Sequence, residues 1–166
     1  MKIKTFLSAL ALCMSVYGYA QDGPISYKEL QAKFPAKVNG YSPQGEKDGS
    51  TLNMSGIHFS TAEWTYAKGD AELNVMFFDY KGSDMMYQQV FSMWNSDLHY
   101  ESDDEEIKGT KINGFPALVT FSKAERTTNV TVGLYDRYII TVDGNNVSKE
   151  EMLAFVKALP FDSFKK

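Results

Sequence analysis

The chain has 166 residues, a formal net charge of −4 and a single cysteine, Cys13. This length is enough for one domain with a hydrophobic core of its own. The negative charge argues against nucleic acid, which selects basic surfaces, and against adhesion to anionic lipid. If Cys13 is removed with the first twenty residues, a disulfide, a cysteine nucleophile and a thiolate metal site are all excluded.

Residues 1–20 have the pattern of a secretory signal peptide. Two lysines precede an uncharged apolar run, residues 6–16, and small residues stand at positions −3 and −1 of a cut after Ala20. The run is too short to span a bilayer, so we expect no membrane span. The sequence predicts cleavage near Ala20 and a periplasmic or secreted protein, residues 21–166. Lipidation of Cys13 is an alternative that the pattern leaves open.

The next part of the sequence predicts a short helix and a β-hairpin. A capping box at residues 26–29 starts the helix, and Pro35 ends it. The stretch from 39 to 50 is rich in Gly, Pro, Ser and Asp and is interpreted as a loop. Apolar and polar residues then alternate in 62–66 and in 73–77, with turn residues between them, which predicts two hairpin strands.

A second helix is predicted after the hairpin. Phe77 and Phe78 are both apolar, which indicates that this end of the strand is covered on both faces. Ser83 or Asp84 can cap the helix that follows. Its apolar residues recur every three or four positions, so one stripe should pack on the sheet. They are Tyr87, Phe91, Trp94 and Leu98, with Met86, Val90 and Met93 beside them.

Short strands in series and a last helix complete the chain. The strands are predicted at 107–112, 117–122, 130–134 and 138–142, and a second capping box at Ser148 starts the helix. The turn between the last two strands lies within 134–137, and the sequence does not fix its register.

These elements predict an α+β fold in the order α-ββ-α-ββββ-α. Strands joined by short turns favour an antiparallel sheet, here of about five to six strands, packed against two or three helices. We expect one domain over residues 21–166. The element order is similar to that of small exported α+β domains of the PsbP and Mog1 shape. The likeness is one of order alone and implies no function.

The inventory of reactive residues argues against most catalytic chemistry. With only His58 and His99, a histidine triad or a three-histidine zinc site is nearly excluded. Phosphate-binding, nucleophile-elbow and zincin motifs are absent from the sequence. The acidic residues of 97–106 could hold Ca²⁺, but a solvated loop is the commoner outcome. We predict that the protein is not an enzyme and binds no metal or cofactor.

The sequence favours an exported binding or accessory module with a protein partner, such as an inhibitor, an immunity-type protein or an envelope accessory protein. Aromatic and methionine side chains of the hairpin and the second helix suit such a surface. The predicted binding residues are Trp64, Tyr66, Tyr80, Met86, Tyr87, Val90, Met93 and Trp94.

Two alternatives stay open. The first is a carrier of an apolar small molecule, held between helix and sheet in a cavity lined by Met86, Val90, Met93, Val75 and Phe77. The second is a hydrolase with two convergent carboxylates of raised pKa, for which Asp79, Glu63 and Glu72 are the nearest candidates.

Overall fold

The computed structural model describes residues 23–165 except 93, 95 and 96. The predicted signal peptide, residues 1–20, therefore lies outside the described residues, as does Met93. In chain order the elements are α1 (Tyr27–Gln31), β1 (Ser42–Met54), β2 (Ile57–Lys68), β3 (Ala71–Asp79), α2 (Asp84–Ser92), β4 (His99–Glu101), β5 (Glu105–Ile112), β6 (Phe115–Ser122), β7 (Thr127–Leu134), β8 (Tyr138–Asn145), α3 (Lys149–Lys157) and the 3₁₀ helix η1 (Phe161–Phe164).

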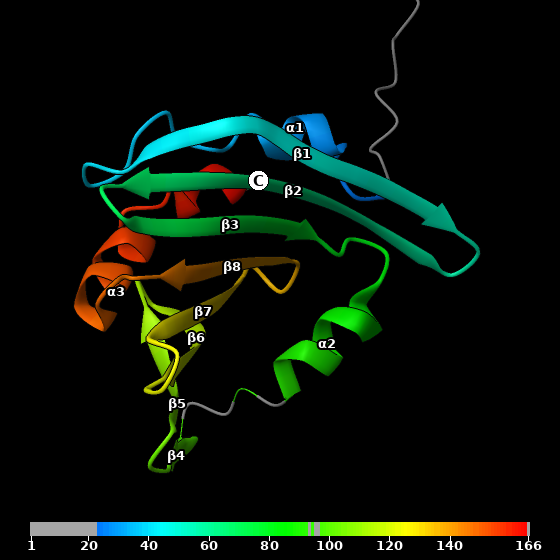
Figure 1. The fold of residues 1–166 in the computed structure, drawn as a ribbon. Helices are drawn as coiled ribbons and strands as arrows, with labels where there is room; N and C mark the ends of the chain where they lie inside the picture. Colours follow the sequence, from blue (N-terminus) through cyan, green and yellow to red (C-terminus); the bar gives the residue numbers. More distant parts are fainter. Residues whose placement is uncertain (1–22, 93, 95–96, 166) are drawn as a thin grey trace, which may run out of the picture.

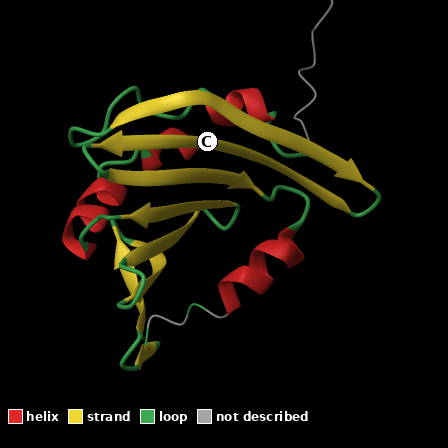
Figure 2. Ribbon diagram, in the orientation of Figure 1, coloured by secondary structure: helices red, strands yellow, loops and turns green. Residues whose placement is uncertain are grey.

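The strands form one antiparallel sheet in the order β1-β2-β3-β8-β7-β6-β5-β4 (Figures 1 and 2). The predicted α+β class and antiparallel sheet are confirmed. The predicted number of strands is wrong, because the sheet has eight, and the element order is α-βββ-α-βββββ-α. The two unpredicted strands, β1 and β4, are the two edges of the sheet.

Neither edge strand was predicted from the sequence, and each case has a physical reason. β1 covers the stretch that was interpreted as a loop, and it contains Pro43 and a bulge between Gln44 and Asp48. Gly45, inside the bulge, has a φ of 63°. An edge strand tolerates proline, glycine and polar residues, because one side of its backbone faces solvent. β4 has only three residues, all exposed.

The turn and cap chemistry agrees with the sequence. Ser26 and Glu29 make both bonds of the first capping box, and the Ser148 side chain caps α3. The turn left open between β7 and β8 places Tyr135 and Asp136 at φ values of 54° and 50°. Leu134 then pairs with Tyr138, which fixes the register of the last hairpin and therefore the face of every residue in it.

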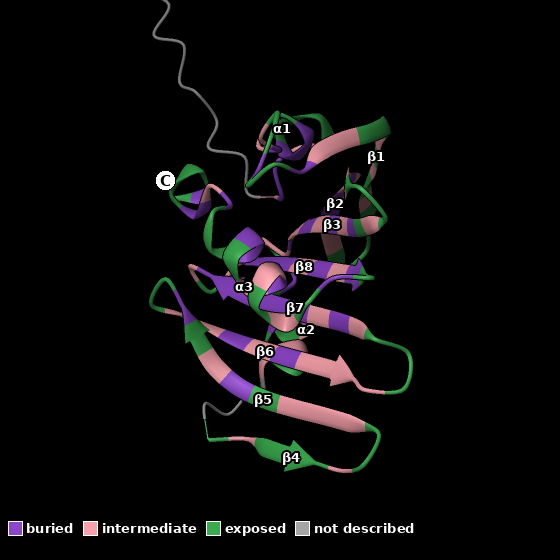
Figure 3. Cartoon of the chain, turned by 60° about the vertical axis from the view of Figure 1, so that its left-hand side comes forward, coloured by how far each residue is buried: buried purple, intermediate pink, exposed green. Residues whose placement is uncertain are grey.

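The hydrophobic core lies on the sheet face that carries α1, α3 and η1, which we call the α3 face. Phe77 of β3 stacks on Phe34 with 4.1 Å between ring centroids, and the edge of Phe164 meets it at 5.1 Å. Figure 3 shows burial concentrated in the central strands and lost toward β4. Fully buried large side chains of this face include Tyr41, Tyr66, Phe155, Leu73 and Ile140.

The opposite face, the α2 face, is covered only in part. A smaller cluster around Tyr87, Trp94 and Ile139 packs α2 on it, with Phe78 and Leu118 at its margin. Polar side chains on the same strands continue this face beyond the helix. They include Glu63, Asn74, Asn129, Thr131, Thr141 and Asp143, several of which hydrogen-bond to one another.

Each long helix docks where a central strand has a glycine. A Cβ atom added to Gly144 of β8 would lie 2.4 Å from Met152 and 2.5 Å from Val147, on the α3 face. One added to Gly133 of β7 would lie 1.8 Å from the Phe91 ring of α2, on the other face. The missing side chains thus let both helices approach the sheet closely.

Candidate functional site

The end of the β1–β2 hairpin projects beyond the rest of the sheet. β3 pairs with β2 only as far as Ser60, opposite Asp79. The last residues of the hairpin therefore form a two-stranded ribbon with no third strand beside it (Figure 1, right). Two of its large hydrophobic side chains are exposed, Met54 at 57 % and Ile57 at 38 %.

The apolar side chains of this ribbon share one face. Leu52 pairs with Phe59, and Met54 pairs with Ile57. Residues directly opposite in an antiparallel pair lie on the same face, as do residues two apart in a strand. All four side chains therefore point to one side, and the Phe59 ring contacts Tyr80 at 6.1 Å. Because Tyr80 packs with the α2 cluster, this is the α2 face.

A serine attaches the start of α2 to the hairpin. The Ser83 hydroxyl accepts a hydrogen bond from the His58 N–H at 2.8 Å and donates one to the His58 carbonyl at 2.7 Å. These bonds join the segment before α2 to the hairpin, and Met85, two residues after Ser83, is 78 % exposed. We call the set Leu52, Met54, Ile57, Phe59, Tyr80 and Met85 the hairpin-end surface.

The backbone next to this surface belongs to an edge strand. β1 is an edge strand, and its residues 49–54 carry no charge and no proline. Uncharged, unprotected edges are the kind to which a further strand can add. A hollow of about 220 Å³ lies beside it, lined by Asp48, Gly49, Ser50, Thr61, Ala62, Glu63, Met76 and Phe78.

The structure divides the predicted binding residues between the two faces. Trp64 and Tyr66 lie on the α3 face, where Tyr66 is fully buried and its hydroxyl donates to the Pro35 carbonyl at 2.7 Å. Burial raises the pKa of Tyr66. The Trp64 indole N–H donates to the Gly45 carbonyl at 3.2 Å. Tyr66 therefore belongs to the main core, and half-buried Trp64 packs against it.

The other predicted residues belong to α2 or to the segment before it. Tyr87 and Trp94 are buried, and Tyr87 stacks on Phe91 at 5.0 Å. Tyr80, Met86 and Val90 are half-buried, and Met93 lies outside the described residues. Only Tyr80 belongs to the hairpin-end surface.

Sequence reasoning missed Leu52, Met54, Ile57 and Phe59. Their signal was present, because they alternate with polar residues on either side of a Ser55-Gly56 turn. The sequence prediction instead places the binding surface on the later part of the hairpin, from Trp64, and on the second helix.

The residues predicted to line a cavity for an apolar ligand lie on opposite faces of the sheet. Val75 and Phe77 are fully buried in the α3-face core, whereas Met86 and Val90 belong to the helix on the opposite face. These residues cannot line one cavity between helix and sheet.

The candidate carboxylates also serve separate contacts. The Arg137 guanidinium donates to buried Asp79 from Nε at 2.7 Å and from Nη2 at 2.5 Å, and the Ile25 N–H donates to it at 2.7 Å. Asn74 donates to Glu63 at 2.8 Å on the other face. A charged, bidentate pair of this kind orders the chain around Asp79.

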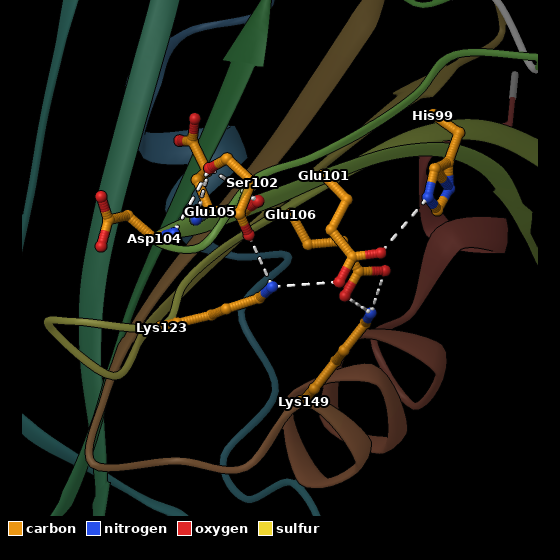
Figure 4. Close-up of polar contacts among 8 residues, drawn as sticks. All are labelled: His99, Glu101, Ser102, Asp104, Glu105, Glu106, Lys123 and Lys149. Carbon is orange, nitrogen blue, oxygen red and sulfur yellow. Dashed lines mark hydrogen bonds and ion pairs between the residues drawn. The ribbon is translucent and has the colours of Figure 1, made fainter.

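The acidic loop is balanced by two lysines (Figure 4). Lys123 donates to Glu101 at 3.0 Å and to the Ser102 carbonyl at 2.7 Å. Lys149 contacts both carboxylate oxygens of Glu106 at 2.7 Å, and this hydrogen bond lowers the pKa of Glu106. Within the described residues, no group of three or more His, Cys, Asp or Glu side chains could hold a metal ion.

Comparisons with known proteins identify no relative that defines a function. No protein-family model and no curated protein matches the chain. Two solved structures are similar to it. A GTP-binding regulator from Thermotoga maritima has 8 % identity and a TM-score of 0.35, over 83 % of this chain and 93 % of that one. An uncharacterised protein from Mycobacterium smegmatis has 13 % identity and a TM-score of 0.34, over 80 % and 94 %.

TM-scores of this size support no argument about function.

Of the helices in the described part of the chain, none has the length and apolar character needed to cross a membrane.

Proposed function

We propose that the chain is an exported binding module, not an enzyme, and that it holds a protein partner on the hairpin-end surface. One observation carries the proposal. Among the described residues, four large hydrophobic side chains are exposed, and three of them, Met54, Ile57 and Met85, belong to this surface. Exposed apolar side chains that gather in one place are typical of interaction sites.

The residue types favour a protein as the occupant. Methionine and aromatic side chains are enriched at protein interfaces, while charged residues are depleted at their centres. The uncharged edge of β1 adds backbone donors and acceptors that a partner strand can use. Such a surface needs no titrating side chain. Export is inferred from residues 1–20, whose pattern is that of a cleaved signal peptide.

Crosslinking in the source cells tests the proposal. A photoreactive residue is placed at position 54 in one variant and at position 100 in another. Tyr100 is a matched control, because it is 50 % exposed but lies on β4, at the other edge of the sheet. We expect one protein to crosslink from position 54 and none from position 100. Equal labelling from both positions contradicts the proposal.

Substitution then measures what the apolar side chains contribute. The double variant Met54→Ser/Ile57→Ser should lower affinity for the crosslinked protein by about tenfold or more, because two apolar side chains leave the interface. Tyr100→Ser should leave affinity unchanged. The mass of the protein recovered from the cell envelope or medium tests export, since cleavage before Gln21 is expected. Unchanged affinity of the double variant would reject the surface.

A further inference from the structure

A hollow of about 750 Å³ lies at the end of the sheet where α3 begins. Its lining includes residues of three connections: the β2–β3 turn, the β6–β7 turn and the loop from β8 to α3. These connections lie at one end of the sheet, because Asn145 at the end of β8 pairs with both Glu72 and Thr127 (Figure 1, left). The hollow therefore joins distant parts of the chain, and its volume is in the range of small-ligand pockets.

Two of the charged side chains in the hollow neutralise each other. Lys149 contacts both carboxylate oxygens of Glu106 at 2.7 Å (Figure 4). The other charged side chains of the lining are Arg126, Asp70 and Glu150. None of the ion pairs within the described part of the chain involves these three. The hollow thus presents one unpaired cation and two unpaired acids.

The unpaired charges of opposite sign stand on separate walls. Arg126 is in the turn that precedes β7, and Asp70 is in the turn that precedes β3. Since β8 lies between β3 and β7, these turns are two strand spacings apart, or about 10 Å. The wall with Asp70 is tied to the start of α3, because Lys68 pairs with Glu151 at 2.6 Å. A ligand that satisfies both walls needs a negative and a positive end.

We propose that this hollow binds a short peptide by its two charged ends. The planar guanidinium of Arg126 can donate two hydrogen bonds to the C-terminal carboxylate. Asp70 and Glu150 supply carboxylate acceptors for the N-terminal ammonium. An extended chain advances about 3.3–3.6 Å per residue, so a peptide of two or three residues spans about 7–10 Å. A free amino acid is too short, because one carbon carries both of its charged groups.

The rest of the lining suits the body of a small peptide. Half-buried Phe121 and buried Val147 supply an apolar floor for small side chains. The Ser148 hydroxyl accepts from the Glu151 N–H at 3.2 Å and keeps its own hydrogen to donate to a peptide carbonyl. The proposal does not depend on the hairpin-end surface, which lies at the other end of β2.

Calorimetry and NMR titration test the proposal with three probes: trialanine, N-acetyl-trialanine and trialanine amide. We expect saturable binding of trialanine at physiological salt, with amide shifts at residues 69–72, 125–128 and 145–150. Each capped peptide should bind about tenfold more weakly or worse, because one charge-assisted hydrogen-bonded end is lost.

Two variants assign the ends of the peptide to the walls. Arg126→Gln should weaken trialanine about tenfold and leave the binding of trialanine amide unchanged, because that peptide has no carboxylate to lose. Asp70→Asn should weaken trialanine and leave N-acetyl-trialanine unchanged. Lys37→Gln and Asp103→Asn are the matched controls with the same changes in charge, and both should bind normally. Lys37 and Asp103 are exposed and lie outside the hollow.

Folding is checked separately by thermal unfolding. Arg126 and Asp70 are exposed turn residues, so both variants should keep the melting temperature of the original chain. Trialanine should raise that temperature in the original chain more than in Arg126→Gln. Three results would overturn the proposal: no saturable binding of trialanine, equal binding of all three peptides, and equal weakening of trialanine by the control variants.

Discussion

Phe77 and Phe78 are neighbours in β3, yet they belong to two different packing environments. Phe77 points to the α3 face, where it is fully buried between Phe34 and Phe164. Phe78 points to the α2 face, where it is half-buried beside Tyr80. The α3 face therefore supplies the core, whereas the α2 face holds one helix, a polar strand surface and the hairpin-end surface. The stability of the fold and the proposed protein binding therefore depend mainly on opposite faces of one sheet.

The largest expected effect compares these two phenylalanines. Phe77→Ala should lower the free energy of unfolding by about 3–5 kcal/mol, because it leaves a cavity among packed rings. Phe78→Ala should cost about 1–2 kcal/mol, because its side chain is already partly in contact with water. Urea unfolding of the two variants measures both values. Equal losses would show that the two faces contribute alike.

A smaller effect is expected where α2 docks. Gly133→Ala places a methyl group on the Phe91 ring, so the ring must move, at a cost of about 1–3 kcal/mol. Because the contact lies on the α2 face, hydrogen exchange should speed up in α2 while β7 and β8 stay protected.

The Phe91→Ala background is the control for this effect. There the methyl group meets no ring, so adding Gly133→Ala should change stability little. An equal cost in both backgrounds would place the strain in the strand and not in the docking of the helix.

The smallest effect concerns the ion pair that holds α3 to β5. The hydrogen bond from Lys149 lowers the pKa of Glu106 below its ordinary value of 4.5. A lowered pKa means stability that is present above the ordinary value and lost as the pH falls through the folded-state value. The melting temperature of Glu106→Gln should therefore fall less steeply than that of the original chain as the pH is lowered below 4.5. Glu72→Gln, an exposed carboxyl on β3, should follow the original curve.

Much of the fold could be predicted, since its signals are local. The alternation of apolar and polar residues and the turn residues predicted β2, β3 and β5 to β8, and capping boxes predicted the starts of α1 and α3. The edge strands could not be predicted in the same way. β1 has the polar, glycine-containing and proline-containing composition of a loop, and only pairing with β2 makes it a strand.

The candidate sites were less predictable than the fold. The sequence predicted a binding surface of aromatic and methionine residues near the hairpin and α2. Of the predicted residues, Tyr80 belongs to the hairpin-end surface. It also grouped Trp64 with Tyr87, which lie on opposite faces. A stripe at helical spacing has an apolar side, but nothing in the spacing states which face of the sheet it will cover.

What the sequence determined by itself is the set of elements whose signals are local: the caps and apolar periodicity of helices, the alternation of strands and the residues of tight turns. The tertiary structure alone decided which strands form the edges, which face each helix covers, and that Asp70 and Arg126 line one hollow. The physical reason is that these features depend on contacts between residues far apart in the chain. Such contacts form only when the sheet order and the close approach at Gly133 and Gly144 bring the elements together.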